Sequence, residues 1–236
     1  MTAKKEFERP DGRAVDETRK ITAKVGIIPN ADGSAMFSFG DTIALAAVYG
    51  PRKMHPQHAQ DPEKATLRCD YSMLSFSTPE RIKPGNSRRS TEISKITEWA
   101  LEPVLIIDKY QNMVVDVFIN ILQANASTRC AGINAAAMAL AHAGIPMKEL
   151  VSSVSIGKLD KQLVVDLNKD EEDWEEGEGA TDIPMSFTAD GKLTHIQLDG
   201  KITIKQLKEA VELGRNATKH IHEIQKKALK EVGERE

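Results

Sequence analysis

The hydrophobic pattern changes its period in the middle of the chain. Within residues 112–122 (NMVVDVFINIL), branched apolar residues recur at every second position: Val115, Val117, Ile119 and Ile121. A period of two places them on one face of a β-strand. An alanine-rich helix is predicted directly after this strand, and Gly144 and Pro146 should end it.

Short apolar runs separated by turn residues come before this strand. Residues 21–50 read as strands joined by tight turns, with Ala-Asp-Gly at 31–33 as a hairpin signal and Gly-Asp at 40–41 as a second turn. The run at 42–49 is almost entirely apolar, which predicts a central strand. Residues 64–73 (KATLRCDYSM) predict one more strand.

A helix should follow an exposed basic loop. Residues 75–90 carry two prolines, one glycine and four basic residues against one acid, a composition that favours a loop. Ser90 or Thr91 should cap the helix, and Pro103 should end or kink it. One apolar stripe at helical spacing supports this helix: Ile93, Ile96, Ala100, Leu101 and Val104.

The second half partly repeats the first. Strands are predicted at 153–159 (SVSIGKL) and 162–167 (QLVVDL), and a second Ala-Asp-Gly lies within TADGKL between two further strands. A long final helix opens at Thr203 with a T-x-x-Q capping box. Each half is thus strands followed by helix. We predict an α+β fold with two sub-domains around mixed sheets, at residues 10–150 and 151–236.

Composition narrows the function classes. The 236 residues carry a net charge of −3, so the whole chain is no basic nucleic-acid binder, and such a role requires a local patch. No apolar run approaches the ~18 residues of a membrane span, and the N-terminus lacks a signal-peptide core. Two cysteines without a CxxC motif favour the cytoplasm over an oxidising compartment and argue against zinc.

The junction between the 112–122 strand and its helix is the first candidate site. Small residues lead into Ser127, Thr128 and Arg129 at the predicted helix N-terminus. Unpaired backbone N–H groups, two hydroxyls and a planar guanidinium suit a bound phosphate. The alternative is an ordinary Ser/Thr cap with a surface arginine.

Acidic and basic segments supply the other candidates. Seven acids within residues 170–178 are typical of a solvated loop, but Asp182 lies at the entry to an apolar strand, where it could bind a divalent cation or act as an acid. Basic residues of the 75–90 loop could follow a nucleic-acid backbone, or the loop could simply be solvated. They are Arg81, Lys83, Arg88 and Arg89.

Four motifs together resemble the RNase PH family. They are LQANASTRCAG, which is similar to the family's Gln-Ala-Asp-x-Gly-(Ser/Thr)-Arg signature, and SRRSTEISK, ERPDGRAVDETRKI and ATDIPMSF. The likeness runs from about Arg9 to residue 220, and two of the motifs are closer to the archaeal exosome branch than to the bacterial one.

The resemblance implies a fold like the second domain of ribosomal protein S5. It also implies 3′→5′ phosphorolysis of single-stranded RNA, with inorganic phosphate as co-substrate and nucleoside diphosphates as products. The implied partners are an inactive homologous subunit, alternating with this chain as a trimer of heterodimers in a hexameric ring, and RNA-binding cap proteins.

The same resemblance assigns roles residue by residue. Thr128 and Arg129 fall on the phosphate-binding pair, and Arg88 and Arg89 fall on the RNA-contacting helix start. Arg68 falls on an arginine of the ring's neck, although Asp70 replaces its usual arginine neighbour. Asp182 falls on the catalytic carboxylate, with Mg²⁺ as its expected metal, and Glu176 stands where bacterial members have a second aspartate. The family's small glycines are replaced by Ala126 and Ser127.

The residues alone favour the same chemistry. Hydrolytic nucleases generally need clustered carboxylates and metals to activate water, whereas phosphate is already an anionic nucleophile at neutral pH. One alternative is a non-catalytic scaffold or RNA-threading subunit of the same ring, which should lack Asp182 or the Thr128-Arg129 pair. A small-molecule kinase on a related fold would need a glycine-rich phosphate loop, which the sequence does not contain.

Overall fold

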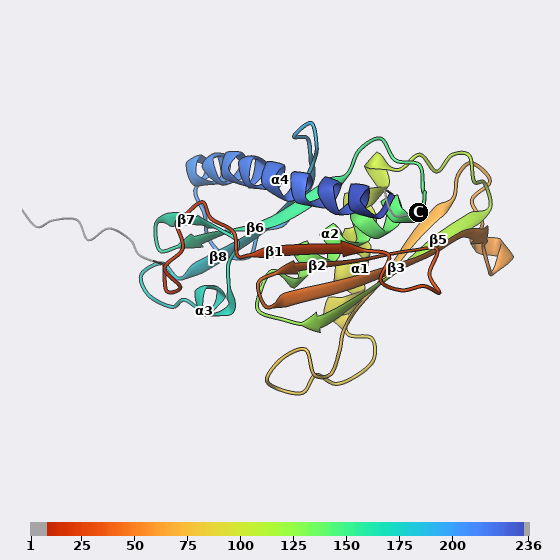
Figure 1. The fold of residues 1–236 in the computed structure, drawn as a ribbon. Helices are drawn as coiled ribbons and strands as arrows, with labels where there is room; N and C mark the ends of the chain where they lie inside the picture. The colour runs from red at the N-terminus through yellow and green to blue at the C-terminus, as the bar shows by residue number, and fades with distance from the viewer. Residues whose placement is uncertain (1–8, 234–236) are drawn as a thin grey trace, which may run out of the picture.

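The computed structural model describes residues 9–233, and two sheets with the long helix α4 (Ile204–Gly233) across them form its frame (Figure 1). The predicted α+β class is confirmed. Residues 1–8, where the sequence predicts no signal peptide, and residues 234–236, at the end of the predicted second half, lie outside the described part. The division after residue 150 stays a prediction.

The first sheet has five strands in the order β1-β2-β3-β5-β4. Its central strand β3 is the predicted 42–49 strand, and a two-residue turn joins it to β2 as expected. The β1–β2 connection spans residues 26–32, so it is longer than the predicted tight turn. Only β4 and β5 pair in parallel within this sheet, which requires the crossover through α1. The strands are β1 (Ile21–Val25), β2 (Gly33–Phe39), β3 (Thr42–Lys53), β4 (Thr66–Met73) and β5 (Met113–Gln123).

The second sheet has four strands in the order β7-β6-β8-β9, and all its pairs are antiparallel, so the prediction of a mixed sheet holds for the first sheet and is wrong for the second. The second Ala-Asp-Gly turns the chain between β8 and β9, as predicted. Thr203 and Gln206 form the expected capping box before α4, because each side chain bonds the other's backbone N–H. The strands are β6 (Val151–Leu159), β7 (Gln162–Val165), β8 (Ala180–Thr188) and β9 (Leu193–Ile196).

Helix α1 (Arg88–Leu101) begins earlier than predicted. Its N-cap is Ser87, not Ser90 or Thr91, and Ser90 completes a capping box by accepting a hydrogen bond from the N–H of Ser87. Arg88 and Arg89 therefore lie in the first helical turn rather than in the loop. A 3₁₀ turn, η2 (Glu102–Val104), contains Pro103 and ends the helix as expected.

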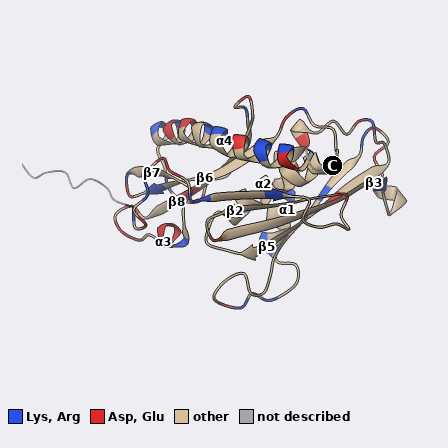
Figure 2. Ribbon diagram, viewed as in Figure 1, with Lys and Arg blue, Asp and Glu red and all other residues tan. Residues whose placement is uncertain are grey.

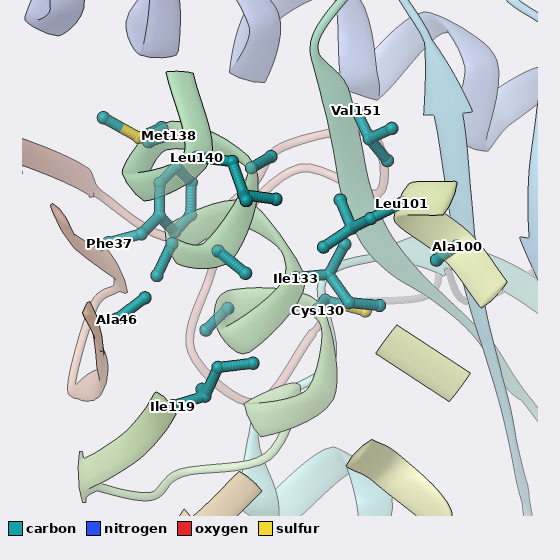
Figure 3. Close-up of a cluster of buried hydrophobic side chains, with 14 of the residues drawn as sticks. Phe37, Ala46, Ala100, Leu101, Ile119, Cys130, Ile133, Met138, Leu140 and Val151 are labelled. Carbon is teal, nitrogen blue, oxygen red and sulfur yellow. The ribbon is translucent and has the colours of Figure 1, made fainter. Parts of the chain in front are cut away.

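Helix α2 (Thr128–His142) forms the centre of the core. Twelve of its fifteen residues are buried, and it packs against both sheets. Figure 3 shows Ile133, Met138 and Leu140 of this helix among side chains of the surrounding strands. A Cβ at Gly33 would lie 2.4 Å from the carbonyl oxygen of Ala139, so glycine is needed where β2 meets the helix.

One continuous apolar cluster joins the two sheets. The predicted buried face of β5 is confirmed, since Val115, Val117, Ile119 and Ile121 have no exposed surface. Residues of α4 pack onto the outer face of the second sheet and reach β1. The minor helices are η1 (Gln57–Ala59) and α3 (Lys169–Glu172).

Candidate active site

A pocket of about 670 Å³ opens where the two sheets meet at the N-terminus of α2. Its lining combines segments far apart in sequence, from the 78–82 loop to β8. All three residues that the sequence proposed for phosphate binding line it, with one proposed catalytic residue and one proposed RNA-binding residue: Ser127, Thr128, Arg129, Asp182 and Arg89. The structure therefore assembles one site from three of the quoted motifs.

The junction before α2 has an unusual backbone. Ala126 and Ser127 both lie in the left-handed region, with φ of 56° and 54°. In the family signature Gln-Ala-Asp-x-Gly-(Ser/Thr)-Arg, the position of Ser127 is occupied by glycine, the residue that adopts this conformation most readily. Ser127 donates its hydroxyl to the Leu167 carbonyl at 3.1 Å and does not cap the helix. The ordinary-cap alternative is thus wrong, and the first turn of α2 opens on the pocket without a side-chain cap.

We expect Ala126→Gly to stabilise the protein. A left-handed non-glycine residue destabilises the folded state by on the order of 1–2 kcal/mol, which glycine would relieve. Glycine also gives the unfolded chain more conformational freedom, and this offsets part of the stabilisation. The net increase in unfolding free energy should be about 0.5–1 kcal/mol, or about 1–4 °C in melting temperature. Ala124→Gly is the matched control, because Ala124 has no positive φ, and it should lower stability. Equal losses in both variants, measured by denaturant unfolding, would refute the strain at residue 126.

Arg129 is held from one side. Its Nη1 donates to Oε1 of Gln197, and Nε2 of Gln197 donates to Oε1 of Glu92 at 3.1 Å. This chain of contacts joins α2, the end of β9 and α1. The other guanidinium donors of Arg129 make no hydrogen bond within the described part of the chain, so they are available to a ligand. Burial, together with the Arg129 charge, lowers the pKa of His195 to about 4 and keeps that imidazole neutral.

Asp182 faces the pocket from β8. It pairs with Gly157 on β6 and bridges to Asp199, so the sheet fixes its backbone. Its carboxylate accepts a hydrogen bond from the Ser155 hydroxyl. Burial raises the pKa of Asp182, and the nearby Glu172 charge raises it further, while Ser155 and Arg129 oppose the shift. The carboxyl therefore holds a proton more readily than an exposed aspartate does.

The three arginines predicted to bind RNA lie in three different hollows of the structure. Arg89 lines the pocket together with Arg81, whereas Arg88 lines a different groove beside Trp99. Arg68 lies on β4, about half exposed, with its Nε 2.5 Å from Oδ1 of Asp116. It lines a third hollow, so neither Arg68 nor Arg88 shares the pocket of Asp182.

The acidic segment contributes a different residue from the one predicted. Glu176 does not line the pocket, and its backbone carbonyl accepts bonds from Trp174 and Gly179. Glu172 and Lys169 of α3 line it instead. Asn168 caps this short helix, and an N-x-x-E capping signature in the sequence could have revealed the turn. The solvated-loop interpretation is wrong for Glu171, whose side chain is fully buried.

Sequence profiles identify the family. Those of the 3′ exoribonuclease family match in two parts, domain 1 over residues 17–146 and domain 2 over residues 149–217. The chain belongs to this family, the RNase PH family that its motifs resemble. Within it, the chain is 49% identical over 224 residues to the exosome complex component Rrp41 of Thermococcus gammatolerans, covering 94% of this chain and 88% of that protein. The Rrp41 component of Methanopyrus kandleri is 43% identical, covering 94% and 92%.

Solved structures share the fold. Rice Rrp46 superimposes with a TM-score of 0.82 at 25% identity, covering 94% of this chain and all of that one. A chain of the Archaeoglobus fulgidus exosome, solved with RNA bound to the active site, gives a TM-score of 0.80 over 92% of each chain. At 22% identity, the second likeness shows the fold alone.

Proposed function

We propose that this chain is the catalytic ring subunit of an archaeal-type exosome and shortens single-stranded RNA from the 3′ end by phosphorolysis. The observation that carries the proposal is the convergence of Arg89, Thr128, Arg129 and Asp182 in one pocket. Similarity to Rrp41 components over almost the whole chain supports the assignment. A scaffold or RNA-threading subunit does not require a carboxyl group with a raised pKa, such as Asp182, in the same pocket as the N-terminus of α2.

The pocket residues divide the chemistry between them. The first turn of α2, with Thr128 and Arg129, holds inorganic phosphate by backbone N–H groups, the Thr128 hydroxyl and the Arg129 guanidinium, while the Ser127 hydroxyl is engaged by the Leu167 carbonyl. One phosphate oxygen attacks the phosphorus of the terminal phosphodiester while Arg89 grips the RNA. The bond from phosphorus to the 3′ oxygen breaks, a nucleoside diphosphate leaves, and the shortened RNA keeps the 3′ oxygen. Asp182 supplies the proton to that oxygen or stabilises it through a bound cation.

Mg²⁺ is compatible with the donor set. Asp182 and Glu172 both line the pocket, and Mg²⁺ commonly binds one or two carboxylates together with phosphate oxygens and water. Among the described residues, no group of three His, Cys, Asp or Glu side chains forms a complete protein cage. A magnesium ion held by Asp182 would neutralise charge that develops on the leaving 3′ oxygen.

The assembly is part of the proposal. We place the chain in a hexameric ring with an inactive homologous subunit and RNA-binding cap proteins, in the cytoplasm. Figure 2 shows acidic and basic residues interspersed along α4, so the positive charges of this helix lie among negative ones. A partner should therefore supply additional phosphate contacts. No helix in the described residues is long and apolar enough to cross a membrane.

The test is a product analysis. Internally labelled RNA is incubated with the chain, alone and with its ring partner, in the presence and in the absence of inorganic phosphate, and the released nucleotides are separated. Nucleoside diphosphates that appear only with phosphate, and mainly with the partner present, support the proposal. Nucleoside monophosphates would indicate hydrolysis, and robust phosphorolysis by a proven monomer would refute the need for a partner.

RNA binding should weaken with salt and report the arginine contacts. For single strands, the logarithm of affinity falls by about 0.7 per phosphate contact for each tenfold rise in salt. Arg89→Gln should reduce that slope by about 0.7 if Arg89 contacts one phosphate. Arg215→Gln on α4 is the control, since Arg215 pairs with Glu212 and does not line the pocket. An unchanged slope in the Arg89 variant would remove this arginine from the RNA path.

A further inference from the structure

None of the described residues of the N-terminal motif ERPDGRAVDETRKI, from Arg9 onward, lines the pocket, yet its arginines reach the second half of the chain. Arg9 forms a two-pronged pair with Glu171, at 2.7 and 2.8 Å. Arg19 forms another with Asp166, where Nε and Nη2 lie 2.8 and 2.6 Å from the two carboxylate oxygens. All four side chains are buried. These pairs fix the segment that leads from β7 into α3.

The guanidinium of Arg19 bonds the loop before α2 as well as Asp166. Its Nη1 donates to the carbonyl of Asn125 and approaches the hydroxyl of Thr42 at 3.4 Å. Thr42 lies at the start of β3 and is fully buried. Its hydroxyl accepts from the Asn125 N–H at 2.9 Å and donates to the Ala126 carbonyl at 2.8 Å. One hydroxyl thus binds the N–H of Asn125 before the left-handed turn and the carbonyl that lies between its two residues, Ala126 and Ser127.

We propose that Thr42, supported by the Arg19–Asp166 pair, is a positioning residue for phosphate binding: it holds the left-handed turn that aims the first N–H groups of α2 into the pocket. Left-handed alanine and serine persist only where neighbouring groups fix them. The Thr42 hydroxyl, the Ser127–Leu167 bond and the bond from Arg19 to the Asn125 carbonyl are side-chain contacts that do so. The inference rests on the proposed function and adds to it a residue outside the pocket.

Thr42 permits a clean substitution. Thr42→Val keeps the β-branched shape that suits a strand and removes only the hydroxyl. Thr42→Ser removes a methyl group and keeps the hydroxyl. Since Thr42 does not line the pocket, neither variant removes a group that touches the substrate.

Steady-state kinetics of the ring complex test the proposal. We expect Thr42→Val to raise the apparent KM for inorganic phosphate about tenfold, the effect of losing a well-placed hydrogen bond, with RNA affinity within twofold of wild type. Thr42→Ser should return the phosphate KM to within about threefold of wild type. A lower melting temperature in Thr42→Val with an unchanged phosphate KM would assign Thr42 a structural role only and overturn the proposal. Equal rises in the phosphate KM and the RNA dissociation constant would also overturn it.

A second variant and a direct binding measurement distinguish a failure of this proposal from a failure of the proposed function. If Thr42→Val does not fold, Arg19→Lys replaces it, because lysine keeps the charge but cannot bridge Asp166 and Asn125 together. If the wild-type complex releases no nucleoside diphosphate, the proposed function fails. The inference is then read from direct calorimetric binding of inorganic phosphate. Tighter or equal phosphate binding by the variant would contradict it, and about tenfold weaker binding would support it.

Discussion

Asp182→Asn should abolish phosphorolysis while leaving RNA binding nearly unchanged. The substitution keeps the size of the side chain and removes its charge and its proton. Loss of a positioned acid typically costs about 10²–10⁴-fold in rate, and loss of a metal ligand adds to this. Single-turnover decay of labelled RNA measures the rate, and filter binding measures the affinity.

Two neighbouring carboxylates provide comparisons for this result. Glu172→Gln removes the other acidic residue of the pocket and should slow turnover less than Asp182→Asn. Glu176→Gln alters a residue outside the pocket, and an unchanged rate there would assign Glu176 to a solvated loop. Activity of Asp182→Asn within a few-fold of wild type would exclude Asp182 from the mechanism.

The same substitution should affect stability in the opposite direction. Burial raises the pKa of Asp182 above the ordinary value of 3.8, so the folded state favours the protonated carboxyl. Its contribution to stability is fully present below pH 3.8 and is lost as the pH rises through the higher native pKa. Asp182→Asn should therefore be relatively more stable than wild type at neutral pH, and this advantage should vanish in acid. Denaturant unfolding at both pH values checks the sign.

Arg129→Lys should raise the apparent KM for phosphate while RNA affinity stays close to that of wild type. Lysine keeps the positive charge but loses the planar fork, which holds Gln197 by one edge and leaves its other donors for phosphate. Losing one charge-assisted bond of about 1.5–3 kcal/mol predicts a rise of about 10–100-fold. Steady-state kinetics at varied phosphate measure it.

The reverse reaction makes this prediction stricter. Phosphorolysis exchanges a phosphodiester for the phosphoanhydride of a diphosphate, so the enzyme should also extend RNA from nucleoside diphosphates. The β-phosphate must then occupy the site of inorganic phosphate, and Arg129→Lys should weaken both directions together. Arg89→Lys is the counterpart that should change RNA affinity alone. A variant of Arg129 that loses RNA binding but keeps its phosphate KM would make that residue an RNA contact.

Sequence patterns predicted those features of the fold that depend on residues close together in the chain. The period-two face of β5, the two-residue turn at 40–41 and the capping box at Thr203 all match the structure. The start of α1 was misplaced because Ser87 and Ser90 form an S-x-x-S capping box, in which serine replaces the usual glutamate or glutamine. Because Ser87 lacks the usual capping partner, the sequence pattern favoured Ser90 or Thr91 as the N-cap instead.

The site was predicted only in part, for a physical reason. Arg89, Thr128, Arg129 and Asp182 stand out by residue type at the ends of elements, and the structure gathers them. Ser155 and Glu172 depend on how β6 pairs with β8 and on how α3 folds back over the pocket. Strand register and loop return are set by tertiary packing, which no single segment encodes.

The burial of α2 has a consequence for how the enzyme stabilises charge. Water surrounding a reacting phosphate must reorient its dipoles as charge shifts, and that reorientation raises the barrier. The N–H dipoles at the start of α2 cannot rotate, because twelve of the helix's fifteen residues are locked between the two sheets. The cost of orienting these dipoles is met once, when the protein folds, and each catalytic cycle then proceeds against a fixed electrostatic field.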